Sequence, residues 1–404
     1  MELEKSLPNP FRPGAGHMPP YLAGRKSETN EFIKLLSQQT ILENMVLTGL
    51  RGVGKTVLLE SFKPSAIKEN WLWVGTDLSE SVSVSEANLA TRLIADLSVI
   101  TSNIVIAQSQ IPLGFSAGQT ETKMSYKLLA NIHNETPGLM LDKLKTVLEF
   151  VWNNLKCISG TRGVIFAYDE AQNLSDQSKK GQYPLGNLLD LFQSIQRKGI
   201  PFMLLLTGLP TLFPKLVDSR TFAERMFTVV ELKRLEKEDS QKAILEPIKN
   251  DQCPVVLSTE SVELIIELSA GYPYFIQFIC KEVYDLFLSK LASGQKDTVP
   301  VDEITRKLDT DFFTGRWSRA TDRQKELLFI IAKLVKNDDE EFSVQEIVEL
   351  AKEDMDKPFS SSHVNQMLVT LTNAGLIYKN RYGKYSFAVP LLGNFILRQH
   401  KLEK

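Results

Sequence analysis

The stretch that decides the fold is Gly49-Leu50-Arg51-Gly52-Val53-Gly54-Lys55-Thr56. It fits the phosphate-binding pattern G-x-x-x-x-G-K-[ST]. An apolar run at residues 44–48 predicts a strand before it, and residues 56–61 predict a helix after it. An ordinary glycine turn ahead of Lys-Thr is the alternative. The strand and helix on either side favour a nucleotide-binding loop, which we call the glycine loop.

Each part of the glycine loop has an expected role in holding ATP and Mg²⁺. Glycines let backbone N–H groups surround phosphate oxygens, at a helix N-terminus whose partial positive charge favours anions. Lys55 is expected to reach the β and γ phosphates, and Thr56 to offer its hydroxyl to Mg²⁺. The residues predicted to bind the nucleotide here are Gly49, Leu50, Arg51, Gly52, Val53, Gly54, Lys55, Thr56 and Val57.

A second apolar strand, residues 163–168, ends in two carboxylates, Asp169 and Glu170. Ligands of open parallel sheets gather beyond the carboxyl ends of the strands. Asp169 is therefore expected to hold the Mg²⁺ shell, and Glu170 to activate the water in line with the γ phosphate. The alternative is an exposed Asp-Glu pair that caps the next helix.

A third apolar strand, residues 201–206, ends in Thr207. Its hydroxyl is a candidate sensor of the γ phosphate at the same sheet edge. A simple strand-to-helix cap explains the threonine as well, and the sequence leaves both open.

The rest of the N-terminal half alternates in the same way. Nearly continuous apolar strands separated by amphipathic helices predict an α/β fold, with a parallel sheet covered on both faces. The further elements expected are a strand at residues 72–76 and helices at 27–36, 86–97, 139–155 and 185–197. Residues 100–138 are polar and weakly patterned, which predicts either a mobile loop or a partner-binding insertion.

The chain of 404 residues is long enough for two or three domains. Strand signals stop near residue 235, and helices at 260–269 and 274–288 predict a small helical lid domain. Helices at 322–335, 344–352 and 362–373, followed by strands at 376–379 and 384–389, predict a winged helix. The predicted division is a Pro/Gly-rich arm at 1–20, a core at 21–235, a lid at 236–311 and a winged-helix domain at 312–404.

Composition narrows the environment and the partners. Forty-seven Lys and Arg against 49 Asp and Glu give a net charge of −2, so a surface for DNA must be local. Three widely spaced cysteines fit a reducing compartment. No signal peptide and no run of about 18 apolar residues is present, and we expect a cytoplasmic protein with no membrane partner.

The chain resembles AAA+ ATPases, in the branch between origin-recognition or initiator ATPases and STAND signalling ATPases. The resemblance covers nearly the whole chain. It rests on GLRGVGKT as Walker A, VIFAYDEAQ (164–172) as Walker B, YLAGRK (21–26), LLLTGLP (204–210), AERMF (223–227) and GYP (271–273).

The resemblance implies further site residues. Tyr21 and Leu22 would lie against the adenine, and Tyr272 and Pro273 would approach the base and ribose. Arg225, or else Arg220, would reach the γ phosphate of a neighbouring subunit, which implies a nucleotide-dependent homo-oligomer. A salt bridge at a helix end is the alternative for Arg225. Gly-Tyr-Pro stands where many members carry a lid arginine, so arginine-based lid sensing is in doubt.

The sequence is compatible with two functions. The first is an ATP-binding and ATP-hydrolysing switch that couples ATP or ADP to double-stranded DNA through residues 360–389. The helix at 362–373 carries no Lys or Arg, and the hairpin after it supplies Lys379, Arg381 and Lys384. The alternative is a STAND-like scaffold that binds protein partners with little or no DNA binding. A metabolic kinase is disfavoured because the C-terminal domain would have no role.

Overall fold

The computed structural model describes residues 8–113, 116–158, 160–249, 253, 255–293, 299–335, 340–381 and 383–402. They form two units, which we treat separately. The sheet unit is Lys26–Thr48 and Leu58–Glu231, and the lid unit is Met1–Arg25, Gly49–Val57 and Leu232–Lys404. Residues 1–7 of the predicted arm and Tyr382 of the predicted hairpin turn lie outside the described residues.

Five strands form the central sheet in the order β2-β5-β6-β1-β7. They are β1 Asn44–Gly49, β2 Trp71–Val74, β5 Gly163–Tyr168, β6 Phe202–Gly208 and β7 Phe227–Leu232. The β2–β5, β5–β6 and β6–β1 pairs are parallel. All residues of β1, β5 and β6 are buried, as expected for strands covered on both faces, and the predicted α/β fold class is confirmed.

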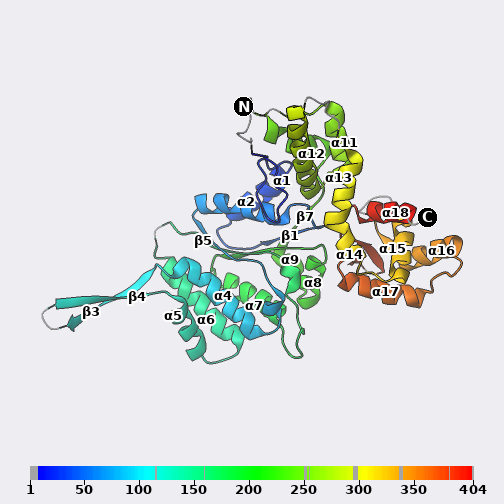
Figure 1. Cartoon of the computed structure of the whole chain (residues 1–404). Coiled ribbons are helices and arrows are strands. Elements are labelled where there is room, and N and C mark those ends of the chain that lie inside the picture. The colour runs from blue at the N-terminus through cyan, green and yellow to red at the C-terminus, as the bar shows by residue number, and fades with distance from the viewer. Residues whose placement is uncertain are drawn as a thin grey trace. The chain divides into compact units, whose positions relative to one another are not determined.

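Helices cover both faces of this sheet (Figure 1). On one side, α1 (Lys26–Leu36) meets α2 (Lys55–Lys68), where Phe32 stacks on Phe62 at 4.2 Å between ring centroids. The prediction that α2 ends at residue 61 is wrong, because the helix continues through Pro64. Burial of Phe62 and Ala66 on either side of this proline offsets the hydrogen bond that it removes.

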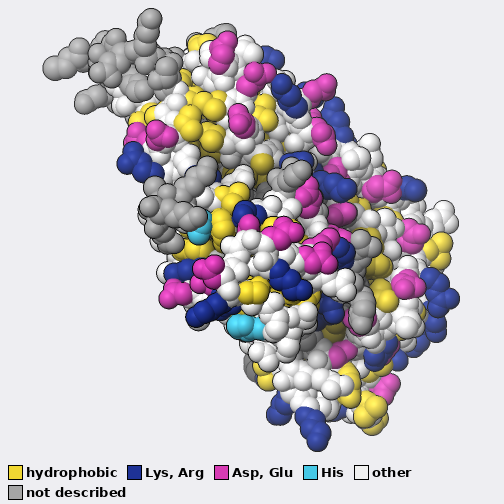
Figure 2. Space-filling model, turned by 90° about the vertical axis from the view of Figure 1, so that its right-hand side faces the viewer, with side chains coloured by type: hydrophobic (Ala, Val, Ile, Leu, Met, Phe, Trp, Pro, Cys, Tyr) yellow, Lys and Arg dark blue, Asp and Glu magenta, His cyan; other side chains and the backbone are white. Residues whose placement is uncertain are grey.

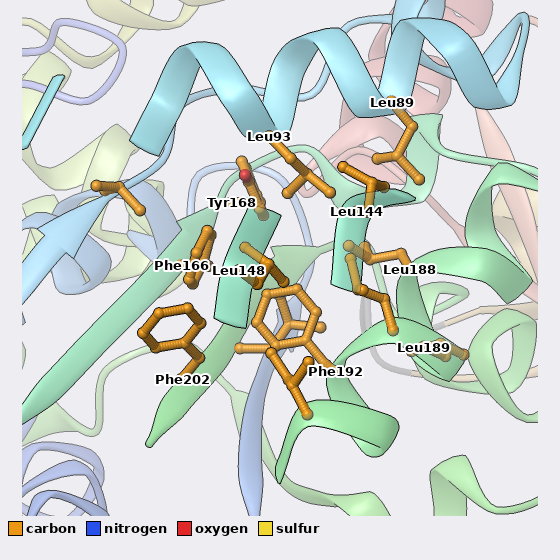
Figure 3. Close-up of a cluster of buried hydrophobic side chains, with 14 of the residues drawn as sticks. Leu89, Leu93, Leu144, Leu148, Phe166, Tyr168, Leu188, Leu189, Phe192 and Phe202 are labelled. Atoms are coloured by element: carbon orange, nitrogen blue, oxygen red, sulfur yellow. The ribbon is translucent and has the colours of Figure 1, made fainter. Parts of the chain in front are cut away.

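The main core lies on the other face, under α4 (Glu86–Thr101), α6 (Met140–Leu155) and α7 (Pro184–Arg197). Figure 3 shows leucines of these helices closing over the aromatic rings of β5 and β6. Phe166 meets Phe192 edge to face at 5.0 Å and Phe202 at 5.5 Å. Full burial of each such ring contributes about 1.5–3 kcal/mol to folding.

A buried polar network fixes the end of β5 to α4. The Tyr168 hydroxyl donates to Asp96 Oδ2 at 2.9 Å, and Arg92 Nε donates to the same carboxylate at 3.0 Å. Figure 3 shows the Tyr168 oxygen turned toward the helix that carries Leu93. Burial and the Asp96 charge raise the pKa of Tyr168 well above its usual value, which keeps the hydroxyl a donor. Tyr168, the residue just before Asp169, is therefore held in place.

The described part of residues 100–138 forms regular elements, and the choice between a mobile loop and a partner-binding insertion stays open. Strands β3 (Val105–Leu113) and β4 (Ser116–Lys123) form an antiparallel hairpin, followed by α5 (Tyr126–Glu135). The hairpin extends away from α4–α6 (Figure 1). At its base, Thr101 Oγ1 donates to the Met124 carbonyl at 2.7 Å. Backbone hydrogen bonds hold the two strands of this hairpin together. Its sequence is too polar for a hydropathy pattern to predict the strands.

In the lid unit, three helices form the predicted lid: α10 Lys237–Leu245, α11 Thr259–Ser269 and α12 Pro273–Ser293. The described part of the arm contacts α12. Asn9 Nδ2 donates to the Lys281 carbonyl at 2.9 Å, and buried Phe11 meets Tyr284 at 6.3 Å.

The C-terminal part of the lid unit contains the three predicted helices and the hairpin. They are α15 Asp322–Leu334, α16 Val344–Asp354, α17 Ser361–Asn373, β9 Ile377–Arg381 and β10 Lys384–Phe387. Strand β8 (Phe342–Ser343) and helix α18 (Leu392–Leu402) were not predicted, and the sheet order is β8-β10-β9. The winged-helix assignment stays a prediction.

The remaining elements are short. They are α3 Glu80–Ser83, η1 Ala171–Asn173, α8 Leu212–Ser219, α9 Ala223–Met226, η2 Glu246–Ile248, α13 Val301–Leu308, the π-helix η3 Asp309–Thr314 and α14 Gly315–Trp317. Within the described ranges, no helix has the length and apolar character needed to cross a membrane.

Candidate nucleotide-binding site

The glycine loop has the backbone that its sequence predicts. Gly52 and Gly54 have φ angles of 81° and 91°, in the left-handed region that favours glycine. A Cβ built at Gly54 meets nothing within 4 Å, so open space lies beside the backbone there. A ligand could approach the main chain at this point, as phosphate does in such loops.

Lys55 is held inside the loop. Its side chain is buried, and Nζ donates to the carbonyls of Gly49 and Leu50 at 2.9 Å each. Thr56 is half-buried, and a Cβ at Gly16 of the arm would come within 3.1 Å of its methyl group. The ammonium predicted to meet phosphate is thus held by loop carbonyls, and the methyl group of Thr56 lies near the arm.

Arg25 braces the loop from the arm side. This buried guanidinium donates to the carbonyls of Val53 and Lys233, at 2.9 and 2.8 Å. Tyr21 and Leu22, predicted to meet the adenine, are each 36% exposed. An apolar pair with this exposure can take up a planar base.

The lid contacts the loop through Tyr274, which the sequence analysis missed. Its backbone N–H donates to the Gly52 carbonyl at 3.1 Å, and its Cβ would lie 3.2 Å from a Cβ at Gly52. The predicted residue Tyr272 is 1% exposed and packs on Phe275, while Pro273 is half-exposed. Burial favours a packing role for the Tyr272 ring, whose contact with nucleotide stays a prediction.

In the sheet unit, Asp169 and Thr207 meet at the carboxyl edge of the sheet. Thr207 Oγ1 and the Glu170 backbone N–H, the latter at 2.7 Å, both donate to Asp169 Oδ1. Both side chains are buried. The Thr207 hydroxyl does not cap the following helix, because the N-cap residue of α8 is Thr211.

Glu170 has a strained backbone. Its φ of 50° and ψ of 34° are left-handed, a conformation that costs a non-glycine residue about 1–3 kcal/mol and often marks functional sites. It precedes η1 but makes no side-chain cap, which argues against the capping alternative.

Gln172, also missed from the sequence, connects Glu170 to the end of β6. Gln172 Nε2 donates to Glu170 Oε2, and Gln172 Oε1 accepts from the Leu209 backbone N–H at 3.1 Å. A Cβ at Gly208 would come within 2.5 Å of Gln172 Oε1, so a larger residue there would displace the Gln172 amide. Lys215 donates to the Gln172 carbonyl, and burial lowers the pKa of Lys215.

The structure separates the two candidate arginines. Arg220 pairs with Asp190 at 2.8 Å, and this hydrogen bond raises the pKa of Arg220. Arg225, on α9, is exposed and makes no ion pair with any residue that the structure describes. It lines an open hollow of about 460 Å³ together with Gln193 and Arg197. Arg225 is therefore the arginine able to meet an external group.

The residues present fit Mg²⁺ carried by a nucleotide. Over the described part of the chain, no group of three or more His, Cys, Asp or Glu side chains could hold a metal ion by itself. Mg²⁺ in phosphate sites is commonly held by one or two carboxylates together with substrate phosphates. Asp169 and Thr56 are suitable ligands of this kind.

Comparison with known proteins identifies the fold. ORC2 of Aeropyrum pernix in its ADP form aligns with a TM-score of 0.54 and 14% identity, over 96% of this chain and 97% of that chain. Its ADPNP–ADP complexes align with a TM-score of 0.53 and 14% identity, over 97% and 98%. The chain therefore shares the fold of these ORC proteins over nearly its whole length, with an α/β sheet core, a helical lid and a C-terminal domain.

Sequence comparison adds little beyond the fold. A protein-family model described as domain of unknown function DUF8462 matches residues 310–396. No curated protein matches the chain.

The brace formed by Arg25 gives the first prediction. Arg25→Lys should weaken nucleotide binding about tenfold, because the shorter lysine side chain cannot place its nitrogen where Nη2 of Arg25 reaches both carbonyls. Titration with a fluorescent ADP analogue measures the change in Kd. Lys26→Ala, at the exposed neighbouring position, is the control. An unchanged Kd in Arg25→Lys would show that the brace does not shape the loop.

Proposed function

We propose that the protein binds and hydrolyses MgATP and uses the nucleotide state as a switch that controls DNA binding. One observation carries the proposal: Asp169, Glu170 and Thr207 cluster at the sheet edge where the glycine loop begins. The register pairs Thr48, the residue before the loop, with Gly208, the residue after Thr207. Chain connectivity therefore starts the loop at this same edge.

The proposed roles follow from the chemistry of the side chains. Lys55 and the loop amides bind the phosphates, while Thr56 and Asp169 hold the Mg²⁺, which neutralises charge on the phosphates. Glu170 orients the attacking water and accepts its proton. Thr207 senses the γ phosphate, because its hydroxyl can rotate between phosphate and Asp169. The adenine lies on Tyr21 and Leu22, beside Pro273 of the lid.

The test separates binding from turnover. Lys55→Ala should abolish ATP binding, while Glu170→Gln should keep binding and lose hydrolysis by at least about 100-fold. Titration with a fluorescent ATP analogue and a phosphate-release assay measure the two effects. Glu349→Gln, an exposed carboxylate on α16, is the control. Wild-type turnover in Lys55→Ala or Glu170→Gln would remove the assignment of the active site.

We further propose that Gln172 positions Glu170. Its amide bridges the Glu170 carboxylate and the backbone just beyond Thr207, so one side chain links the water-activating group to the sensor strand. Gln172→Ala should lower kcat about tenfold and leave KM unchanged, because orientation is lost while phosphate binding is not.

A double-mutant cycle checks this role. Gln172→Ala combined with Glu170→Gln should lose no more turnover than Glu170→Gln alone, since both changes act on one group. Gln366→Ala, on the exposed side of α17, is the control. Additive losses would contradict the proposal and indicate a general structural defect.

Arg225 is proposed to act in a neighbouring subunit of a nucleotide-dependent homo-oligomer. Arg225→Ala should lower turnover at least about 100-fold at concentrations where subunits assemble, as expected for an arginine finger. Activity measured across a protein dilution series tests this, and Arg197→Ala in the same hollow is the control. A monomer whose specific activity is independent of concentration would contradict it.

DNA coupling is proposed through residues 360–389 as a winged helix. The hairpin supplies Lys384, but this side chain pairs with Glu346 at 3.1 Å, and Asn380 donates to Glu341 at 2.6 Å. Acidic groups therefore share the hairpin. Figure 2 likewise shows Lys and Arg interleaved with Asp and Glu over one face of the molecule. A DNA surface here would gain affinity from positive charge beyond Lys384.

The alternative, a STAND-like scaffold for protein partners, is favoured by the β3–β4 hairpin. A projecting two-stranded ribbon has backbone groups along its outer edges that can pair with another chain. Binding of random duplex DNA at moderate salt in the ATP state distinguishes the two functions. We expect such binding from a DNA-coupled switch and little or no DNA binding from a protein scaffold.

A further inference from the structure

Three arginines from separate places in the sequence come together in the lid unit. Arg51 belongs to the glycine loop, and its Nη2 atom lies 3.8 Å from the position of a Cβ at Gly375, just beyond α17. Arg316 and Arg319 lie in and just after α14. Burial, followed by the charges of Arg51 and Arg319, lowers the pKa of Arg316, which places the three groups within electrostatic reach of one another.

The position of Arg316 is fixed by the lid. Its guanidinium carbon lies 4.8 Å from the centre of the Phe312 ring, and Nη1 donates to the Phe312 carbonyl at 2.6 Å. The Phe312 ring lies 5.4 Å from that of Tyr274, whose backbone N–H donates to Gly52. Arg316 is thus anchored beside the same loop that carries Arg51.

No acidic partner offsets this charge. None of the three arginines forms an ion pair with a residue in the described part of the chain. Asp311 lies close enough to raise the pKa of Tyr274, after burial, but does not pair with Arg316. Packing on Phe312 explains the position of Arg316 but not those of Arg51 and Arg319, whose side chains are exposed. Like charges held together in this way favour an anion among them.

We propose that Arg51, Arg316 and Arg319 form a phosphate-binding site that holds the DNA backbone beside the end of α17. This inference rests on the proposed coupling to DNA. Arg316 and Arg319 fall within the stretch matched by the domain of unknown function.

Two features favour DNA phosphate as the ligand. The α17 helix offers polar side chains to bases but no Lys or Arg, and Lys384 of the hairpin is already paired with Glu346. Phosphate contacts supply most of the affinity and fix the register of a recognition helix. Arginines beside α17 provide what the helix lacks. Because Arg51 is part of the glycine loop, a change of the loop on nucleotide binding moves one member of the site.

The experiment measures binding of a fluorescent random-sequence duplex across a salt series with ATP present. Arg316→Gln and Arg319→Gln should each reduce the slope of log K against log salt by about 1, the effect of one lost phosphate contact. Arg316→Lys should retain the slope, which separates charge from packing. Lys333→Gln is the matched control, because it removes one charge that is already paired with Asp354.

Three outcomes overturn the inference, each differently. If the wild type binds DNA and both glutamine variants keep its slope, the site is wrong while the DNA switch stands. If the variants instead weaken affinity for ATP with an unchanged DNA slope, the phosphate belongs to the nucleotide. If the wild type binds no duplex in any nucleotide state, the DNA-coupled switch and this site both fail, and ATP turnover is judged separately.

Discussion

The buried carboxylate of Asp169 is the constraint on which the site depends. An unpaired carboxylate at this depth would cost several kcal/mol, so the surrounding structure must supply donors. Thr207 and the Glu170 backbone N–H supply them. The segment just after β2 then fixes the backbone of Asp169. The Asp169 N–H donates to the Thr76 carbonyl at 3.2 Å, and the Asp169 carbonyl accepts from the Leu78 N–H at 2.9 Å. The left-handed turn at Glu170 persists because its neighbours on both sides are fixed.

Helix α4 extends this constraint to the hairpin. Its buried Asp96 holds Tyr168 at the end of β5, and its last residue, Thr101, bonds the chain at the hairpin base. A displacement of the β3–β4 hairpin would act on α4 through Thr101. A shift of α4 would in turn break the hydrogen bond between Tyr168, next to Asp169, and Asp96. Two hydrogen bonds of α4 thus connect the base of the hairpin with the residue before Asp169.

The sequence predicted the features that depend on local pattern. Strands buried on both faces appear as continuous apolar runs, so β5 was predicted with its observed bounds and the polar residues after it were placed correctly. Features created by tertiary contacts were missed. The β3–β4 hairpin is formed by backbone pairing rather than by an apolar pattern in its sequence. Gln172 meets Glu170 and the Leu209 N–H because β5 and β6 end side by side. Tyr274 and the predicted Tyr272 lie two positions apart at the start of α12. The sequence does not tell which of the two contacts the glycine loop, because that depends on how the helix packs.

The lid unit joins the glycine loop to the C-terminal helices through one aromatic cluster. Tyr274 bonds Gly52 and meets Phe312, while Phe313 stacks on Phe395 of α18 at 5.2 Å. The cluster passes through the π-helix at residues 309–314, a geometry often found at functional positions. Close-packed rings transmit a displacement because they cannot absorb it by compression. A rearrangement of the glycine loop that shifts Tyr274 would therefore be felt at Phe312 and, through Phe313, at Phe395 of α18. The aromatic cluster is thus the part of the lid unit that can link the glycine loop to the C-terminal helices.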